Sequence, residues 1–316
     1  MNEEPSSTSE NRTSGPSNQR NSHRIRWRVD PSSVREASWG IILGVLVFTA
    51  VYFVLAWSKV DLIRSVSNPV TAATGGLVTA TLLIYIPLLL ITIAGLILWA
   101  GGLQPADIGL TRGDLPIGIA VTVVAWVLIQ LGVVLSLLNS GDPVAINEEW
   151  YVAGVLVVLG PLVAQLLGNA LFEEVVMRGF LLVQVHKLAR RYVPDRRRSA
   201  FVLALVGSQL VFGLLHIPNR LAAGASGPQL VLGIVLPSLI GMLLALVFYR
   251  TGNLFIAIGL HAFMNYPTLL VDPQGLGETY AIFLALVVAV GWPWLAKAAT
   301  ALRIAALGTD DRFTSD

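Results

Sequence analysis

The sequence contains no cysteine and few charged residues. The absence of cysteine excludes disulfide bonds, thiolate metal ligands and a cysteine nucleophile. Charged residues make up 13% of the 316 residues, whereas a soluble domain carries about 25%. The net charge is only +2 and no Lys/Arg cluster is interleaved with aromatic residues, so nucleic acid is not an expected partner. Hydrophobic residues make up 55% of the chain, which indicates a protein that crosses a membrane several times.

The apolar residues gather in eight runs, most of them about the 20 residues that a membrane-spanning helix needs. The runs cover 38–58, 77–100, 116–138, 151–186, 199–218, 229–249, 254–271 and 279–299. The predicted fold class is therefore all-α, a polytopic membrane protein with about eight transmembrane helices and a site between helices in the bilayer. The run 151–186 is too long for one span, and Gly160-Pro161 predicts a break within it.

The chain divides into three predicted parts. Residues 1–36 are polar, with almost no aliphatic side chains, and are expected to form a disordered cytoplasmic tail. Residues 37–300 form the membrane domain, and 301–316 a short cytoplasmic tail. Lys and Arg concentrate in alternate loops, which predicts an integral cell membrane protein with both termini in the cytoplasm. The predicted outer loops hold only Lys59, Arg64 and Arg220 as basic residues.

Apart from His186 and Lys297, which lie at the ends of their runs, five charged or histidine side chains fall inside the apolar runs: Glu173, Glu174, Arg178, His216 and His261. Each ionised group at bilayer depth costs roughly 2.5–3.5 kcal/mol on insertion scales, so such residues are functional candidates by default.

The helical period separates the charges into two groups. Glu174 and Arg178 are four residues apart on one face and are expected to neutralise each other as an ion pair. Glu173 points to another face without a partner on its own helix, which suits a general base. His261 and Asn265 are also four apart and project to one side as hydrogen-bond donors.

Two histidines, an amide and a glutamate supply a base, a group that holds water and donors for an oxyanion, which suits amide hydrolysis. No GxSxG or HExxH sequence occurs, although Glu173, His216 and His261 are chemically acceptable zinc ligands. A proton-coupled transporter and a non-catalytic membrane scaffold or immunity protein are the alternatives from other functional classes.

Three short sequences carry a family resemblance: "EEVVMR", "FGLLH" and "HAFMN", of the forms EExxxR, FxxxH and HxxxN. In this order and on apolar runs, they resemble the CPBP family of intramembrane proteases. This family is also called Abi or CAAX amino-terminal protease proteins, and includes the type II CAAX prenyl endopeptidase. The resemblance covers 171–265, about a third of the chain.

The resemblance implies an intramembrane endopeptidase that cuts a membrane-associated protein or peptide in the lipid bilayer. It implies that Glu173 and His216 activate water and that His261 and Asn265 stabilise the oxyanion. Three further residues would support the site: Glu174, Arg178 and Phe212. The preferred version requires no cofactor, and the alternative version uses zinc.

Counting residues along the two helices places His216 and His261 at different depths in the membrane, although both are expected in one site. At 1.5 Å per residue, His216 lies about 25 Å and His261 about 10 Å from the inner boundary of its helix. The fifth helix is therefore expected to be tilted, to begin below the bilayer or to have different bounds. Access to the site is expected from the cytoplasm.

Overall fold

The computed structural model describes residues 34–194, 196–272 and 276–308. It confirms the all-α class, because the described residues contain helices and a single isolated β-bridge between Ile146 and Val271. Residues 1–33 of the expected N-terminal tail and 309–316 of the C-terminal tail lie outside the described residues. The last helix continues to Gly308, past the expected end of its span at residue 299.

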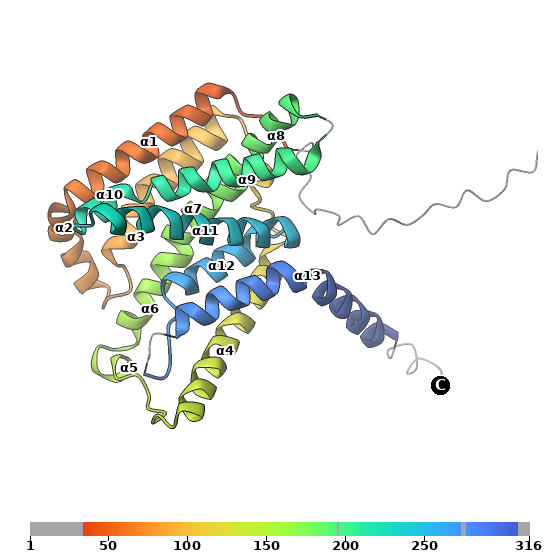
Figure 1. The fold of residues 1–316 in the computed structure, drawn as a ribbon. Coiled ribbons are helices and arrows are strands. Elements are labelled where there is room, and N and C mark those ends of the chain that lie inside the picture. The colour runs from red at the N-terminus through yellow and green to blue at the C-terminus, as the bar shows by residue number, and fades with distance from the viewer. Residues whose placement is uncertain (1–33, 195, 273–275, 309–316) are drawn as a thin grey trace, which may run out of the picture.

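The helices follow one another with short connections (Figure 1). Their bounds are α1 Trp39–Ser58, α2 Val60–Ala73, α3 Ala80–Leu88, η2 Leu89–Ala100, η3 Pro105–Ile108, α4 Leu115–Ser140, α5 Glu149–Val152, α6 Val155–Ala164, η4 Gln165–Asn169, α7 Ala170–Glu174, η5 Val175–Leu182, α8 Val183–Tyr192, α9 Arg197–Leu214, α10 Ile217–Ala222, α11 Gly227–Thr251, α12 Leu254–Asn265 and α13 Gly277–Gly308. The segments η2, η4 and η5 are π-helical, and η3 is a 3₁₀ helix.

Within the described residues, seven helical stretches are long and apolar enough to cross a membrane. Seven of the eight predicted runs correspond to these stretches. The run 254–271 instead forms α12, which ends at Asn265. The helix stops there because Pro267 disfavours a helical conformation at Tyr266, whose φ and ψ are −154° and 93°.

The chain nevertheless crosses the molecule an eighth time. Asn253, just before α12, donates its Nδ2 hydrogen to the carbonyl of Asp114 beside the start of α4, at 2.7 Å. Leu270, after α12, accepts from the backbone N–H of Asn147 beyond the end of α4, at 3.0 Å. The 26 residues of α4 span about 39 Å. A short helix and an extended segment together therefore replace the eighth spanning helix.

The predicted break at Gly160-Pro161 is wrong. Residues Val155–Tyr192 form one helical stretch of 38 residues, with Pro161 inside α6. Gly160 lies against the backbone carbonyl of Gly76, an approach that a Cβ atom would prevent. Pro161 lacks the N–H that an α-helix requires, and the stretch departs from α-geometry at η4 and η5 rather than ending.

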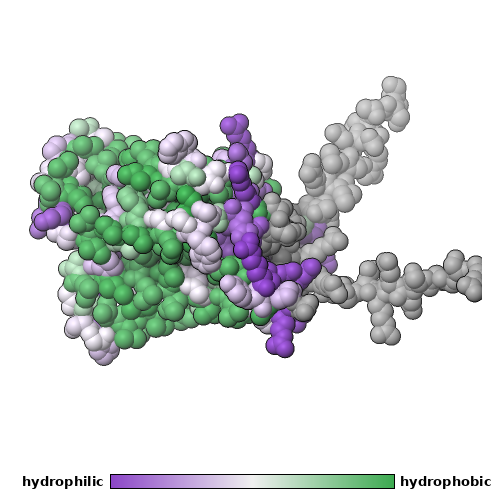
Figure 2. Space-filling view, turned by 90° about the horizontal axis from the view of Figure 1, so that it is seen from above, coloured by the Kyte–Doolittle hydropathy of each residue, from purple (hydrophilic) through white to green (hydrophobic). Residues whose placement is uncertain are grey.

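The helices end at two opposite faces of very different charge. At one face the start of α1 meets α8, where Arg191 pairs with Glu36 at 2.6 Å. This face, here called the basic end, carries Arg35, Arg112, Lys187, Arg190, Arg191, Arg196, Arg197, Arg198 and Arg250. Figure 2 shows apolar residues across the middle of the visible surface, with a band of hydrophilic residues at one end.

The other face is here called the opposite end. It contains α2, α5, α10 and the segment 266–272, as Figure 1 shows at the left and lower left. The bridge between Ile146 and Val271 joins two of its loops. Its described charged residues are Lys59, Asp61, Arg64, Asp142, Glu148, Glu149, Arg220, Asp272 and Glu278.

Candidate active site

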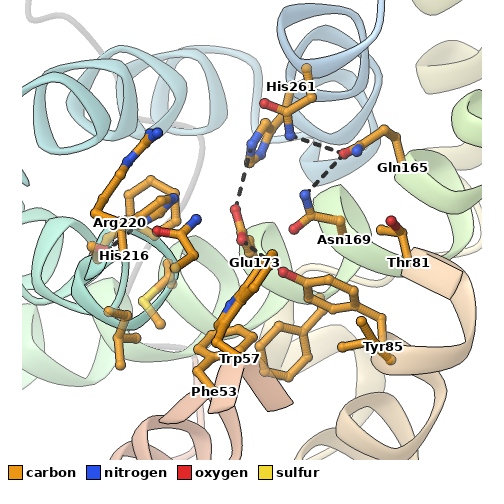
Figure 3. A pocket seen from close by; sticks show the side chains of 17 residues that line it. Phe53, Trp57, Thr81, Tyr85, Gln165, Asn169, Glu173, His216, Arg220 and His261 are labelled. Carbon is orange, nitrogen blue, oxygen red and sulfur yellow. Dashed lines mark hydrogen bonds and ion pairs between the residues drawn. The ribbon is translucent and has the colours of Figure 1, made fainter. Parts of the chain in front are cut away.

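A cavity of about 340 Å³ lies between α1, α3, the stretch from η4 to η5, α9, α10 and α12. This volume is in the range of small-molecule sites, which are about 300–1,000 Å³. The lining residues are Phe53, Trp57, Thr81, Ile84, Tyr85, Gln165, Asn169, Phe172, Glu173, Met177, Phe212, Leu215, His216, Asn219, Arg220, His261 and Asn265. Every residue expected to be catalytic lines this one cavity (Figure 3).

The ion pair between Glu174 and Arg178 lies behind the cavity wall. Arg178 Nη1 is 3.0 Å from Glu174 Oε1, and both side chains are fully buried. The guanidinium N–H groups are not aligned for a hydrogen bond to this oxygen, so the contact is mainly electrostatic. Arg178 Cζ also lies 4.4 Å from the centroid of the Phe212 ring, a cation–π distance. The sequence prediction of the pair is confirmed as a contact.

Close helix packing leaves room for this stack. Gly241 of α11 faces it, and a Cβ atom there would lie 2.9 Å from Arg178 Nη2 and 2.9 Å from Phe212 Cδ1. Glycine allows α11 to approach the guanidinium and the ring at the same time.

His261 of α12 bridges the two glutamates. Its Nδ1 is 2.7 Å from Glu174 Oε1, and its Nε2 is 3.5 Å from Glu173 Oε2. Glu174 therefore contacts both Arg178 and His261, and fixes the ring so that Nε2 faces Glu173 in the cavity. The two glutamates carry two negative charges, and Arg178 and His261 carry two positive charges when His261 is an imidazolium, so the net charge of the cluster is then zero.

Glu173 is 8% exposed and has partners from other helices. Besides His261, the Tyr85 hydroxyl of α3 donates to Glu173 Oε1 at 3.3 Å. Figure 3 shows the carboxylate between these two side chains, with His216 on another wall of the cavity. No direct contact joins Glu173 to His216 among the described interactions, so any partnership of these two residues requires a bridging group.

His216 lies at the end of α9, where its Nδ1 hydrogen bonds to the Phe212 carbonyl at 2.8 Å. That bond leaves Nε2 for other partners. The Phe212 ring stands between the two histidines, with centroid distances of 4.7 Å to His216 and 6.4 Å to His261. The conflict in depth is thereby resolved: the histidines line one cavity at different levels and do not touch.

Asn265 belongs to an amide network that the sequence analysis missed. Its Nδ2 donates to Gln165 Oε1 at 2.9 Å, and Asn169 Nδ2 donates to the same oxygen at 3.1 Å. The network could have been found from the sequence. One polar residue recurs every four positions in this apolar run, at Gln165, Asn169 and Glu173, so all three lie on one face of the helix as a polar stripe. Tyr85 carried no comparable signal.

The buried amide oxygens of Asn169 and Asn219 have no hydrogen-bond partner. Buried polar atoms are nearly always paired, so these two oxygens are suited to accept hydrogens from a polar occupant of the cavity.

The residues considered for zinc do not fit a zinc site as they stand. Within the described residues, no three His, Asp or Glu side chains are arranged to hold a metal ion. His261 directs both nitrogens at carboxylates, and Phe212 separates it from His216.

Comparison with known proteins finds a match to one family model. Residues 155–267 match the family model described as type II CAAX prenyl endopeptidase Rce1-like. The match covers about a third of the chain and contains every expected catalytic residue. No curated protein and no solved structure matches the chain.

Proposed function

Because residues 155–267 place the chain in the Rce1-like family of type II CAAX prenyl endopeptidases, we propose that it hydrolyses a peptide bond of a membrane-associated protein or peptide. The substrate would be cut within or beside the bilayer, since the cavity lies among membrane-crossing helices. Both termini and the basic end would face the cytoplasm, following the distribution of Lys and Arg.

One observation carries the proposal. Glu173 is a nearly buried carboxylate that lines a cavity, and it faces His261, whose other ring nitrogen is held by the Glu174–Arg178 pair. A carboxylate beside an oriented imidazole is the arrangement that a general base and a charge-stabilising partner require. A purely structural ion pair would need no cavity next to it.

We assign the steps as follows. Glu173 accepts a proton from a water molecule, and the water oxygen bonds to the carbonyl carbon of the substrate. His216 Nε2 holds this water from the other side of the cavity. The carbonyl oxygen becomes an oxyanion, which accepts hydrogen bonds from Asn265 and from His261 as an imidazolium. Glu173 then delivers its proton to the leaving amide nitrogen, and the C–N bond breaks.

The amide network supports the assignment of Asn265. One of its two Nδ2 hydrogens is directed at Gln165, which fixes the orientation of the amide and leaves the second hydrogen for an oxyanion. The preorganised donor avoids a reorganisation cost during the reaction.

Substrate trapping tests the proposal. Membrane proteomes are compared between cells that express the wild type and cells that express Glu173→Gln. We expect at least one protein or peptide to be shortened only with the wild type. Glu148→Gln, an exposed carboxylate at the opposite end, is the matched control and should cleave normally.

Other outcomes point to the alternative functions. A purified Glu173→Gln variant that still cleaves the identified substrate would refute the assignment of the base. Proton-gradient-dependent solute flux that is lost in Glu173→Gln would favour a transporter. A biological effect that survives both His216→Ala and Asn265→Ala would favour a non-catalytic scaffold. Activity that a chelator removes and zinc restores would favour the metal-dependent enzyme.

A further inference from the structure

We propose that the cavity opens toward the extracytoplasmic side, so its substrate presents the cleaved segment at the outer leaflet or outside the cell. The description of the occupant as a substrate rests on the proposed function, whereas the side of access does not. An outward mouth differs from the cytoplasmic access expected from the sequence, and it restricts the substrates to exported peptides and to outward-facing parts of membrane proteins.

The position of the cavity along the helices is the first argument. Trp57 is 18 residues beyond Trp39, the first residue of α1 at the basic end, which places it about 27 Å along the helix. His216 is 19 residues beyond Arg197, the first residue of α9, or about 28 Å along the same direction. Both side chains line the cavity near the opposite end.

Burial gives the direction of the opening. The cavity floor is closed, since Glu173 is 8% exposed, His261 4% and Phe172 1%. Lining residues nearer the opposite end are open, with Trp57 36% exposed and Arg220 also exposed. Figure 3 shows Arg220 and His216 on the same side of the cavity, away from the Glu173 and His261 pair.

The route from the basic end is packed with side chains. All eight residues of η5, which leads from Glu174 toward the basic α8, are buried. Among them, Phe180 and Leu182 are 0% exposed. A peptide that approached from the basic end would have to displace this core, whereas one from the opposite end meets the exposed rim.

Charge then assigns the two ends to the two sides of the membrane. Lys and Arg near membrane spans are retained on the cytoplasmic side. The described part of the basic end contains three times as many basic residues as the opposite end, with nine against three. The opposite end is therefore extracytoplasmic, and so is the mouth of the cavity.

Because the natural chain has no cysteine, single cysteines report accessibility without background. The variants are Ser226→Cys at the opposite end, Ser199→Cys at the basic end and Thr81→Cys in the cavity lining. Ser226 and Ser199 are both exposed and form a matched pair of nearly isosteric substitutions. Cells with an intact cytoplasmic membrane are treated with a membrane-impermeant maleimide, before and after permeabilisation.

We expect Ser226→Cys and Thr81→Cys to react in intact cells and Ser199→Cys to react only after permeabilisation. The reverse pattern for the two serine positions would overturn the assigned orientation. Labelling of Ser226→Cys without labelling of Thr81→Cys until the membrane is permeabilised would overturn the outward opening. Ala223→Cys replaces Ser226→Cys if the latter is not produced, because Ala223 is exposed in the same loop.

The proposed function can fail independently of this inference. The labelling does not require catalysis, so the same pattern is expected when Glu173→Gln is added to each variant. Outward labelling together with full cleavage by Glu173→Gln would refute the catalytic assignment and leave the side of access intact.

Discussion

Replacing Arg178 by methionine should destabilise the protein more than any change to a surface charge. The substitution removes a fully buried guanidinium, so Glu174, also fully buried, loses its arginine counter-ion and the two glutamates share the single positive charge of His261. Removing one partner of a buried ion pair lowers the free energy of unfolding by about 3–5 kcal/mol, because an uncompensated charge remains. The same substitution also removes the cation–π contact with Phe212, which adds roughly 1–2 kcal/mol when desolvated.

The second half of the pair offers a rescue. Glu174→Gln combined with Arg178→Met removes both charges and keeps an amide oxygen at the position that accepts from His261 Nδ1. The double variant should therefore regain most of the unfolding free energy that the single variant loses through the unpaired charge. It should not regain the part lost with the Phe212 ring contact.

The assay is equilibrium unfolding in mixed micelles, followed by circular dichroism as the denaturing detergent fraction rises. Arg64→Met is the control, because Arg64 pairs with Asp61 at 3.6 Å while their side chains are 65% and 94% exposed. The control should lose no measurable stability. The reasoning is refuted if Arg178→Met unfolds at the same detergent fraction as the control, or if the double variant is less stable than the single one.

Three further changes probe the site, and their activities are measured on a substrate captured with Glu173→Gln. Tyr85→Phe removes the donor to Glu173 Oε1 and should lower kcat/KM roughly 2- to 10-fold, the size of one weak hydrogen bond. Tyr52→Phe is the control and should leave kcat/KM unchanged, because the Tyr52 hydroxyl donates to the Ile84 carbonyl and not to Glu173. Gln165→Leu removes the shared acceptor of Asn169 and Asn265 and should reduce kcat on the order of 10- to 100-fold. The control Gln229→Leu changes an exposed glutamine and should leave kcat unchanged. An unchanged kcat in Gln165→Leu would argue against a positioning role for Gln165. Gly241→Ala should destabilise the protein by about 1–3 kcal/mol through its contacts with Arg178 and Phe212, while Gly207→Ala, with open space around it, should stabilise it by up to about 1 kcal/mol. Equal melting temperatures for the two alanine variants would contradict the packing argument.

The sequence predicted best the features that a single helix determines. The contact of Glu174 with Arg178 follows from the helical period alone, because both residues are on one helix and four positions apart. Seven of the eight expected spans were also predictable, whereas Pro267 shortens the eighth to α12 and its extended continuation. Pro161 misled the prediction, because the helix continues through it into the π-helical segment η4.

Contacts between helices were not predictable in the same way. Whether Glu173 faces His216 or His261 depends on the relative depth and tilt of α9 and α12, and residue spacing within one helix does not fix these quantities. The side on which the cavity opens was not predictable for the same reason. Gln165 and Asn169 belong to a third case, because their spacing from Glu173 was visible in the sequence and was overlooked.

The partners of the buried charges enter the membrane at different times, because the chain is made from its N-terminus. Arg178 emerges four residues after Glu174, so this pair can close within one helix while that helix leaves the insertion machinery. Glu173 meets Tyr85 from an earlier helix, and His261 arrives only after α9 and α11 have been made. The Glu174–Arg178 pair can therefore form before the other contacts, whereas the contacts of His261 with Glu173 and Glu174 form only when α12 docks. Assembly of the candidate catalytic group is in this way a late event that requires every helix up to α12 to have been made.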